Sequence, residues 1–591
     1  MDQKEQIFME SANKYVEWNK VIREDYSLWM RGYAFVDDQY YIEEALAQYI
    51  SNCLELVPSI ERTLTLKKLI PKLSGCWALI YATNSILLAS VDRLRSIPLF
   101  YGMENSKLLL SDCASEILNK LTNAKLDDIC TTEFLVTGYV TGKDTLYKGL
   151  YQIQPGEILE IKTSSAQINS NRYYRFIHGD YFESDRQELE EELSELLHRM
   201  SNRYATALKG KTIVVPLSGG LDSRLLVAMF KKCGIENVIC FSYGRQGNKE
   251  AEISRSVAKA LGYKWLFCPY DSWYNWFRGE QYSSYIKYAS GLSGISHEQD
   301  WPATKKILDD ISDTNKEDMV FVPGHSADFL AGSHIPDELL FVNDDMRIYG
   351  ELAVEAILSH HYNQWNWRSV CPHLKDSFCE RIGEILSVYP QIENKSQAIG
   401  AFETWDFESR QARFIVNSVR VYEFWGCKWM LPLWDNELTD FFSKIKLELR
   451  IRKTLYRSTL LKHIFTNQLS KLAEIPISGL PLLESDTERN KKGTYSSLLN
   501  SVYPTFRKFI PDFIANSHRT SINLQNDSMN LYDIYTERGT TKLRDIIPLS
   551  AIDRMPTSVK KILRRNRKRP TTALSINGLH AAYHIALLLM D

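Results

Sequence analysis

The sequence predicts a mixed α/β protein with three parts: a β-rich N-terminal domain, a parallel-sheet domain and a helical C-terminal part. The first observation behind this prediction is a series of short apolar runs, separated by turns, between about residues 33 and 162. The second is an alternation of strand-like and helix-like segments from residue 186 onward, which is typical of a parallel α/β sheet. The third is the return of apolar residues at helical spacing beyond about residue 375.

Length and composition limit the class of protein. The chain of 591 residues is too long to fold around one ordinary hydrophobic core, which predicts more than one domain. Its 44% hydrophobic and 24% charged residues are typical of a globular protein. A formal net charge of -2 gives no general attraction for nucleic acid or anionic membranes. The N-terminus lacks the apolar core of a signal peptide, and the longest uncharged stretch, residues 75–91, carries Thr83 and Asn84 in its middle, which predicts a hairpin. We therefore expect a cytoplasmic protein with no nucleic-acid partner and no membrane partner.

The apolar runs of the first domain read GCWALIYA, ILLASVD, KLLLSD and GEILEI, and each is predicted to be a strand. A polar, aperiodic stretch at residues 164–171 is expected to be the linker to the second domain. After it, QELEEELSELLHRM has the apolar spacing of an amphipathic helix. Ten scattered cysteines without a CxxC pair predict reduced side chains rather than a disulfide framework.

The segment VVPLSGGLDSRLL, residues 214–226, leads from a buried strand into a helix through serines and glycines. Backbone N–H groups at a helix N-terminus, approached closely through glycines, form a cradle for anions. Ser218 and Ser223 add hydroxyl groups, and Asp222 adds a carboxylate suited to Mg²⁺. The turn has no lysine, which disfavours a Walker-type loop and γ-phosphate transfer. We predict that it holds a pyrophosphate with its metal; a turn without a ligand is the alternative.

A second strand-to-loop element, VFVPGHSADFLAG at residues 320–332, again ends an apolar strand in glycine and small residues. It offers one carboxylate, Asp328. Because the carboxyl ends of parallel strands meet at one edge of a sheet, Asp222 and Asp328 are predicted to lie over one crevice and to share a metal.

At these residues the sequence resembles a known family. SGGLDS looks like the pyrophosphate loop of the N-type ATP pyrophosphatases, and its spacing to GHSAD is similar to that of the asparagine synthetase branch. Further similar stretches are LPLWDNELTDFF, KTLYR and, in the first domain, GCWALIYA and VDRLRSIPLFYG. The resemblance implies an Ntn-hydrolase-like glutaminase domain over residues 1–165 and an ATP-pyrophosphatase synthetase domain over residues 180–470. It says little about residues 471–591, expected to be a helical extension with a basic segment.

The chain departs from the family in its glutaminase half. Asparagine synthetases need a cysteine directly after Met1 as the nucleophile, and position 2 here is Asp, so the fold is expected without glutamine hydrolysis. The resemblance shifts toward β-lactam synthetase, lasso-peptide cyclases and asparagine synthetase-like proteins of polysaccharide pathways. It implies an ATP-dependent carboxylate-amine ligase that forms an amide through an acyl-AMP intermediate, releases AMP and pyrophosphate, and uses ATP and Mg²⁺. The partners would be a small-molecule or peptide carboxylate and an amine; a homodimer or a partner protein is left open.

The resemblance also implies roles for single residues. Lys453 would neutralise charge on the acyl adenylate, and His325 would deprotonate the amine, with Glu408 or Glu423 orienting the imidazole. A histidine that only binds a phosphate or a backbone carbonyl is the alternative for His325. The metal ligands would be Asp222 and Asp328. The residues expected to bind the nucleotide are Leu217, Ser218, Gly219, Gly220, Leu221, Asp222, Ser223, Ser242, Tyr243, Gly244 and Gly324.

Alternatives for the function and for three further features stay open at this point. One alternative is an ammonia-dependent amidotransferase acting on an amino acid or a sugar uronic acid; another is a non-catalytic subunit that binds nucleotide or a partner protein. The sequence does not give the role of Arg224, and pairing with a carboxylate on its helix is one interpretation. GISHEQDW, residues 294–301, lines the substrate side or is a solvated turn, and the basic residues 560–569 form a solvated face or clamp a polyanionic substrate.

Overall fold

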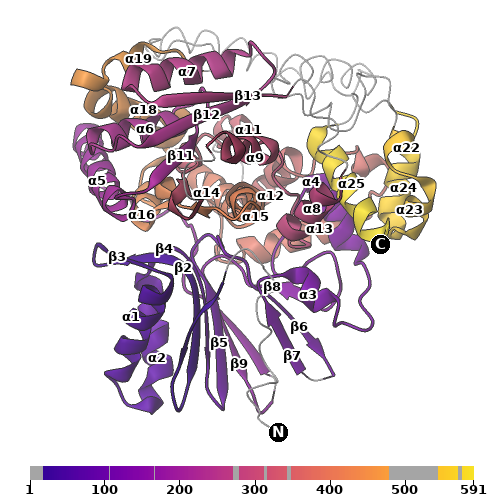
Figure 1. Ribbon diagram of the computed structural model, residues 1–591. Coiled ribbons are helices and arrows are strands. Elements are labelled where there is room, and N and C mark those ends of the chain that lie inside the picture. The colour runs from indigo at the N-terminus through magenta and orange to yellow at the C-terminus, as the bar shows by residue number, and fades with distance from the viewer. Residues whose placement is uncertain are drawn as a thin grey trace.

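The computed structural model describes residues 17–105, 107–165, 167–270, 279–311, 316–342, 348–477, 543–569 and 575–590. The antiparallel sheets of the first domain lie below the parallel sheet and the helices of the second (Figure 1). The predicted class is confirmed: an antiparallel N-terminal domain is followed by a parallel-sheet domain and a mostly helical part.

The first domain is built on a seven-stranded antiparallel sheet in the order β1-β2-β4-β5-β9-β10, with β3 paired to β2. Its strands are β1 (Asn19–Ile22), β2 (Ser27–Val36), β3 (Gln39–Ile42), β4 (Ser74–Ala82), β5 (Ile86–Val91), β9 (Glu157–Lys162) and β10 (Gln167–Arg172). Alternate residues of β4, Trp77 and Leu79, pack in one buried cluster with residues of α1 (Glu43–Glu55) and α2 (Ser59–Leu69). The backbone N–H of Thr83 donates to the carbonyl of Ile86 at 2.8 Å, so the hairpin predicted within residues 75–91 is confirmed.

A second, three-stranded sheet completes the β-structure of the first domain. It contains β6 (Phe100–Glu104), β7 (Lys107–Ser111) and β8 (Leu150–Gln152), and it is accompanied by α3 (Ala114–Leu118) and α4 (Asp128–Thr137).

The linker predicted at residues 164–171 is wrong. Residues Gln167–Arg172 form β10, an edge strand antiparallel to β9 with Ile168 opposite Ile161. Most side chains of β10 are exposed, so its sequence is polar and lacks the alternation that identifies a half-buried strand. The sheet of the first domain therefore continues past residue 165.

The second domain begins with α5 (Arg186–Ala207) and contains five parallel strands in the order β13-β12-β11-β14-β15. The strands are β11 (Thr212–Pro216), β12 (Val238–Gly244), β13 (Lys264–Pro269), β14 (Met319–Phe321) and β15 (Lys428–Trp429), and the helices between them include α6 (Asp222–Lys232), α7 (Lys249–Leu261), α8 (Glu280–Ser290) and α9 (Trp301–Asp310). Ile213, Val214 and Val215 of the central strand are fully buried. This β-branched run explains why β11 occupies the middle of the sheet.

Beyond β14 the chain is mostly helical, and the prediction of helices beyond about residue 375 is confirmed. The helices are α10 (Ala327–Leu330), α11 (Asp337–Leu340), α12 (Tyr349–His360), α13 (Leu374–Leu386), α14 (Lys395–Asp406), α15 (Arg420–Phe424), α16 (Asn436–Ser443), α17 (Leu447–Arg450), α18 (Thr454–Thr459) and α19 (Lys471–Glu474). No helix among the described residues is both long enough and apolar enough to cross a lipid bilayer.

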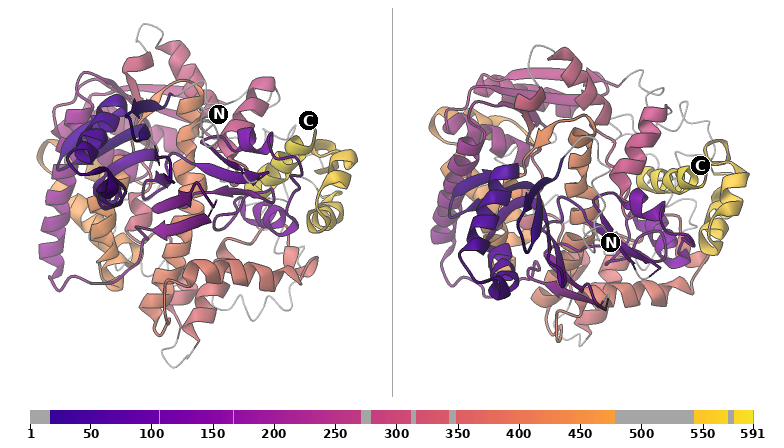
Figure 2. Two further views of the ribbon diagram at one scale, coloured as in Figure 1. Left: turned by 90° about the horizontal axis from the view of Figure 1, so that it is seen from below. Right: turned by 60° about the horizontal axis from the view of Figure 1, so that its bottom comes forward.

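The described C-terminal helices are α22 (Leu543–Ile546), α23 (Leu549–Arg554), α24 (Thr557–Asn566) and α25 (Ile576–Met590). They lie at the side of the molecule, where α24 and α25 contact α4 of the first domain and α25 also contacts α8 of the second (Figure 1, Figure 2). The last helix therefore packs against both domains.

The basic segment, residues 560–569, lies mainly on α24. Lys561, Arg564 and Arg565 are exposed, as expected for a solvated face. Ile562 and Leu563 of the same helix are buried, so the segment has a packed side as well.

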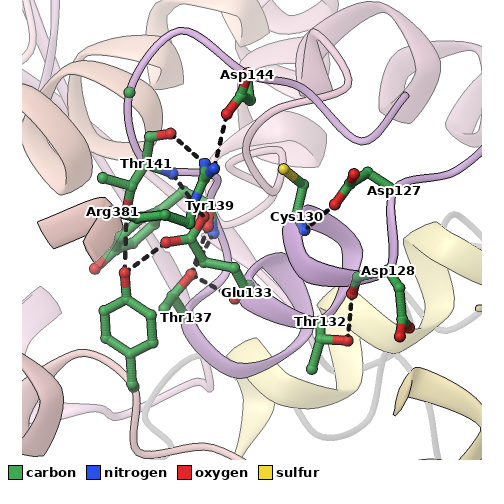
Figure 3. A network of polar contacts seen from close by, with 12 residues as sticks. Asp127, Asp128, Cys130, Thr132, Glu133, Thr137, Tyr139, Thr141, Asp144 and Arg381 are labelled. Atoms are coloured by element: carbon green, nitrogen blue, oxygen red, sulfur yellow. Dashed lines mark hydrogen bonds and ion pairs between the residues drawn. The ribbon is translucent and has the colours of Figure 1, made fainter. Parts of the chain in front are cut away.

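A buried polar network joins the first domain to the helical part (Figure 3). Glu133 of α4 is fully buried and forms an ion pair with Arg381 of α13, with Nε 3.0 Å from Oε2. The hydroxyl of Tyr362 donates to the same carboxylate at 2.5 Å. Arg381 also pairs with Asp144 at 2.7 Å and donates to the carbonyl of Thr141 at 2.6 Å. The network fixes α13 against the first domain, because a buried carboxylate is stable only beside charged or hydrogen-bonding partners.

Candidate active site

The serine- and glycine-rich turn joins β11 to α6, as predicted. The backbone N–H of Ser218 donates to Ser223 Oγ at 3.1 Å, and the two hydroxyl oxygens also lie 3.1 Å apart. The backbone N–H of Gly220 donates to Ser218 Oγ at 3.1 Å, while Gly219 and Leu221 complete the turn. No side-chain cap hydrogen bond is present at the start of α6, which leaves its first backbone N–H groups without a side-chain acceptor and fits an anion cradle.

Gly324 lets a second loop approach this turn. The loop follows β14, and the backbone N–H of Val322 donates to the carbonyl of Val214 at 2.9 Å. A Cβ atom on Gly324 would lie 2.4 Å from the Cα of Ser223 and 2.5 Å from its backbone nitrogen. The two backbones therefore touch, and only glycine fits at position 324.

Asp222 and Asp328, which the sequence predicts to share a metal, are in direct contact. Asp222 Oδ2 accepts the backbone N–H of Asp328 at 2.9 Å, and Asp222 Oδ1 accepts the hydroxyl of Tyr456 at 3.0 Å. The hydroxyl of Ser333 donates to Asp328 Oδ2 at 3.1 Å. Burial, and then the negative charge of Asp328, raise the pKa of Asp222 well above its usual value. Two adjacent carboxylates whose charges repel form a hard-oxygen donor set that fits Mg²⁺.

The KTLYR segment approaches the same carboxylates. Lys453 has a φ of 60° and directly precedes α18. Its positive charge lowers the pKa of Asp222, so the ammonium group acts on the candidate metal site. Tyr456 lies three residues further along and holds Asp222 through its hydroxyl, although sequence reasoning missed it. The position of Tyr456 in the first turn of α18, three residues after Lys453, is the sequence feature from which its role could have been predicted.

His325 lies in the loop between Gly324 and Asp328, and it is a half-buried, neutral imidazole. Its Nε2 atom lies 2.9 Å from the hydroxyl of Ser418, whereas its Nδ1 atom has no hydrogen-bond partner among the described residues. Burial, and then the charge of His297, lower the pKa of His325 to about 4.

Glu423 does not orient His325, contrary to the sequence prediction. It forms ion pairs with Arg31 at 2.9 Å and with Arg420 at 2.5 Å, and the hydroxyl of Tyr288 donates to it at 2.6 Å. The arginine charges hold the pKa of Glu423 below its usual value against the effect of burial. Glu423 is thus a counter-ion, since its oxygens are already occupied by two guanidinium groups.

Glu408 does not orient His325 either. It pairs with two arginines of the first domain, Arg172 at 3.1 Å and Arg175 at 2.7 Å. Its carboxylate therefore joins the domains, and the described hydrogen-bond partner of His325 is Ser418.

The GISHEQDW stretch is not a solvated turn. Asp300 is buried, accepts the hydroxyl of Tyr422 at 2.8 Å and pairs with His297 Nδ1 at 3.2 Å. The charge of Asp300 raises the pKa of His325 while that of His297 lowers it, so both residues act electrostatically on the imidazole. Part of the electrostatic environment of His325 thus comes from this stretch.

The residues predicted to form the adenine pocket lie at the carboxyl ends of β11 and β12. The strands are parallel, with Pro216 opposite Phe241, which puts Leu217 and Ser242 side by side. Both are buried, and the ring of Tyr243 stacks on that of Tyr270 with centroids 5.3 Å apart. Gly244 ends the strand at a φ of 116°.

Arg224 does not pair with a carboxylate on its helix, contrary to the interpretation from the sequence. Its fully buried guanidinium donates to the carbonyls of Leu472 at 3.0 Å, Ile475 at 2.7 Å and Pro476 at 2.8 Å. Burial lowers the pKa of Arg224 to about 10. Arg224 thus fixes the segment after α19 against the start of α6.

Comparisons with known proteins match both domains in the observed order. Residues 59–174 match a family model described as a glutamine amidotransferase domain, and residues 205–272 match one described as asparagine synthase. The chain is 29% identical over 184 residues to a probable asparagine synthetase (glutamine-hydrolyzing) of Acanthamoeba polyphaga mimivirus. These matches support an asparagine synthetase-family protein over two parts of the chain. The match to the viral relative covers 31% of the chain and about a third, 32%, of that relative's length.

Two solved structures have weaker similarity. An NH3-dependent NAD synthetase from Campylobacter jejuni matches with 13% identity and a TM-score of 0.19, over 36% of this chain and 98% of that one. A glutamine phosphoribosylpyrophosphate amidotransferase from B. subtilis matches with 9% identity and a TM-score of 0.19, over 52% of this chain and 63% of that one. The asparagine synthase match includes Asp222 but ends before Asp328 and Lys453, so the roles of those two residues depend on geometry.

Proposed function

We propose that this asparagine synthetase-family protein is an ATP-dependent carboxylate-amine ligase that forms an amide through an acyl-AMP intermediate and releases AMP and pyrophosphate. The observation that carries the proposal is the contact of Asp222 with Asp328 beside the uncapped N-terminus of α6. A hard-oxygen pair for Mg²⁺ and an N–H cradle for pyrophosphate lie at one edge of the parallel sheet. The asparagine synthase match over residues 205–272 supports the use of ATP.

In the first step an oxygen of the substrate carboxylate attacks the α-phosphorus of ATP, and the bond from that phosphorus to the bridging oxygen of pyrophosphate breaks. The N–H groups of α6 and the hydroxyls of Ser218 and Ser223 bind the departing pyrophosphate, where negative charge develops. Bound Mg²⁺, held by Asp222 and Asp328, would supply neutralising charge. Lys453 contributes a further positive charge beside the carboxylates.

In the second step the amine attacks the acyl carbon, the bond to the adenylate oxygen breaks, and AMP leaves. The nitrogen must lose a proton, and His325 is a neutral acceptor with an unpaired Nδ1 among the described residues. Its pKa of about 4 is far below that of a free ammonium group, so it accepts the proton only as the nitrogen bonds to carbon and becomes acidic. The nearby carboxylate of Asp300 would stabilise the imidazolium that forms.

We propose that the amine does not come from glutamine hydrolysed by this chain. A nucleophilic thiol needs a lowered pKa, because the thiolate is the reactive form. Burial instead raises the pKa of Cys76, Cys113 and Cys130, three of the four cysteines between residues 17 and 165. The fourth, Cys53, lies on α1, a helix packed on the seven-stranded sheet.

The domain interface gives a second argument. A cavity there is lined from the first domain by Arg31 and Arg95 and from the second by Arg413 and Arg420. No carboxylate of the described residues forms an ion pair with Arg95, and the charges of Arg413 and Arg420 lower its pKa after the larger effect of burial. Asp112, which also lines the cavity, and Glu423 pair with Arg31 and Arg420, so the remaining positive charge is that of Arg95 and Arg413. This charge would disfavour the passage of a protonated ammonium ion and would not affect neutral ammonia.

The test is pyrophosphate release by the purified full chain with ATP, Mg²⁺ and a panel of carboxylates, with free ammonia or an organic amine. We expect release that requires a particular acid, falls to background in Asp328→Asn and is unchanged in Asp309→Asn, a control at an exposed position near the end of α9. Absence of release with every acid, or equal release by the two variants, would overturn the ligase proposal. Supplying glutamine as the only nitrogen source should yield no glutamate; glutamate release would overturn the proposal on the amine.

A further inference from the structure

Glu298, His580 and His584 bring three side chains that can ligate a metal to one buried point. The two histidines are four residues apart on α25, which puts them on one face of the helix. Glu298 lies between α8 and α9. The three residues are at most 5% exposed, and one donor atom from each lies within 4.8 Å of the others.

The donor atoms face one another. The Nε2 atoms of His580 and His584 are 3.0 Å apart, and His580 Nε2 forms an ion-pair contact with Glu298 Oε1. The hydroxyl oxygen of Ser296 lies 3.0 Å from His584 Nε2 and 3.3 Å from His580 Nε2. The hydroxyl of Tyr282 donates to Glu298 Oε1 and orients that carboxylate.

Hydrogen bonds alone satisfy this arrangement only in part. A neutral imidazole has one N–H group, whereas His580 Nε2 faces a second imidazole nitrogen, a carboxylate oxygen and a hydroxyl. Protons on both Nε2 atoms would repel each other across 3.0 Å, and lone pairs on both would repel the carboxylate as well. With a proton on His580 Nε2 alone, that single N–H can point at only one of its three polar neighbours. A cation between the atoms would accept a lone pair from each.

We propose that Glu298, His580 and His584 bind one divalent transition-metal ion, for which Zn²⁺ is the best match, with the Ser296 hydroxyl or a water as the fourth ligand. Two imidazoles and one carboxylate are donors that Zn²⁺ commonly takes in tetrahedral sites. In a tetrahedral site, metal–ligand bonds of about 2.0 to 2.2 Å place neighbouring ligand atoms about 3.3 to 3.6 Å apart. The separations of 3.0 and 3.3 Å need only small side-chain shifts to reach that geometry.

The bound ion would join α25 to residues 293–300, a segment of the second domain that is hydrogen-bonded to the first domain. Ser293 and Ile295 hydrogen-bond through their backbones to Val140 and Gly138 of the first domain, each at 2.8 Å. Asp300, whose charge acts on His325, follows in the same segment. The site would therefore fix α25 against the wall of the candidate active site, and the pair His580-x₃-His584 is the sequence signal for it.

The test begins with the metal content of the full chain, purified without a histidine tag or chelator. Elemental analysis should find about one zinc per chain. Replacement by Co²⁺ should give the intense visible absorption of a tetrahedral nitrogen-ligated ion, which an octahedral carboxylate site does not give. Chelation should lower the melting temperature, and Zn²⁺ should restore it, because the folded chain binds the ion and the unfolded chain lacks the site.

Variants assign the ion to these residues. His584→Asn and Glu298→Gln should lose the zinc and the cobalt spectrum, whereas His373→Ala, which changes an exposed histidine, and Asp222→Asn should keep both. If a site variant does not fold, the metal content and the Co²⁺ spectrum of the unmodified chain decide whether the site exists. An unmodified chain without stoichiometric metal and without a cobalt spectrum would overturn the proposal, as would equal metal in His584→Asn and His373→Ala.

Discussion

The carboxylate of Asp222 accepts the backbone N–H of Asp328 at 2.9 Å, which joins the first turn of α6 to the start of α10. The bond holds the Asp222 carboxylate against the backbone of Asp328 although the two side-chain charges repel, and burial and the charge of Asp328 raise the pKa of Asp222. A backbone donor rather than a flexible side chain sets this geometry. The site is thus preorganised for a cation before one binds.

Magnesium should stabilise the protein through these two residues. At 100 times the dissociation constant, bound Mg²⁺ adds about 2.7 kcal/mol to the free energy of unfolding. Asp222→Asn should abolish the Mg²⁺-dependent rise in melting temperature, which scanning calorimetry measures at pH 7. Without Mg²⁺ the variant should be at least as stable as the unmodified chain, because the amide removes a buried charge. An equal Mg²⁺ effect in both proteins would contradict the metal assignment.

The same pKa shift predicts a pH dependence. The folded pKa of Asp222 lies above its unfolded value of about 3.9, so the folded state binds the proton more tightly. The contribution of the Asp222 proton to the free energy of unfolding is fully present below the unfolded pKa, and it is lost as the pH rises through the folded pKa. Metal-free stability should therefore fall more with rising pH in the unmodified chain than in Asp222→Asn. Identical pH profiles by urea denaturation would contradict this.

Gly324→Ala should impair both the site and the fold. The added Cβ would lie 2.4 Å from the Cα of Ser223, so the loop must move away from the start of α6. We expect a loss of about 1 to 3 kcal/mol in the free energy of unfolding and a large loss of pyrophosphate release. Gly350→Ala is the matched control, since nothing lies within 4 Å of its added Cβ. Equal stability of the two variants would contradict the close approach.

His325→Ala should separate the two half-reactions. Amide formation should slow by about a hundredfold or more, the scale for losing a positioned base, while ATP-pyrophosphate exchange driven by the acid survives. Higher pH should partly rescue amide formation, because more of the amine arrives deprotonated. Ser418→Ala, which keeps the imidazole and removes its hydrogen-bond partner, should have a smaller effect. A parallel fall of exchange and amide formation would make His325 a phosphate or structural ligand.

Arg381→Met should destabilise the joint between the first domain and α13. It leaves the fully buried carboxylate of Glu133 without its ion-pair partner, which costs about 3 to 5 kcal/mol. Arg368→Met is the matched control, because its ion pair with Glu355 is exposed and contributes about 0 to 1 kcal/mol. Calorimetry should separate the variants clearly. Equal melting temperatures would mean that the buried pair does not hold the joint.

The parts of the site that the sequence predicts are those with local signals. The turn at Ser218 and the strand-end aspartates are visible because an apolar strand, glycines and a helix follow one another within about a dozen residues. Gly324 and Ser223, a hundred residues apart, meet because parallel strands share one edge.

The parts that the sequence does not predict depend on distant contacts. Tyr456 and Ser418 become site residues only through the packing of helices far along the chain. Arg224 lacks a carboxylate partner because carbonyls after α19 fill that space. Glu423 is neutralised by Arg31 of the other domain, a pairing across 392 positions that no periodicity reveals. The polar edge strand β10 resembles a linker because solvent covers its side chains.

The central claim, activation of a carboxylate as an acyl adenylate, is tested most directly by oxygen transfer. The substrate acid would be labelled with ¹⁸O in its carboxylate, and the nucleotide product would be analysed by mass spectrometry after amide formation. The account predicts one ¹⁸O atom in AMP and none in pyrophosphate, because the carboxylate oxygen that attacks the α-phosphorus stays with it when the amine displaces AMP. Label in inorganic phosphate together with ADP, or AMP without label, would contradict it.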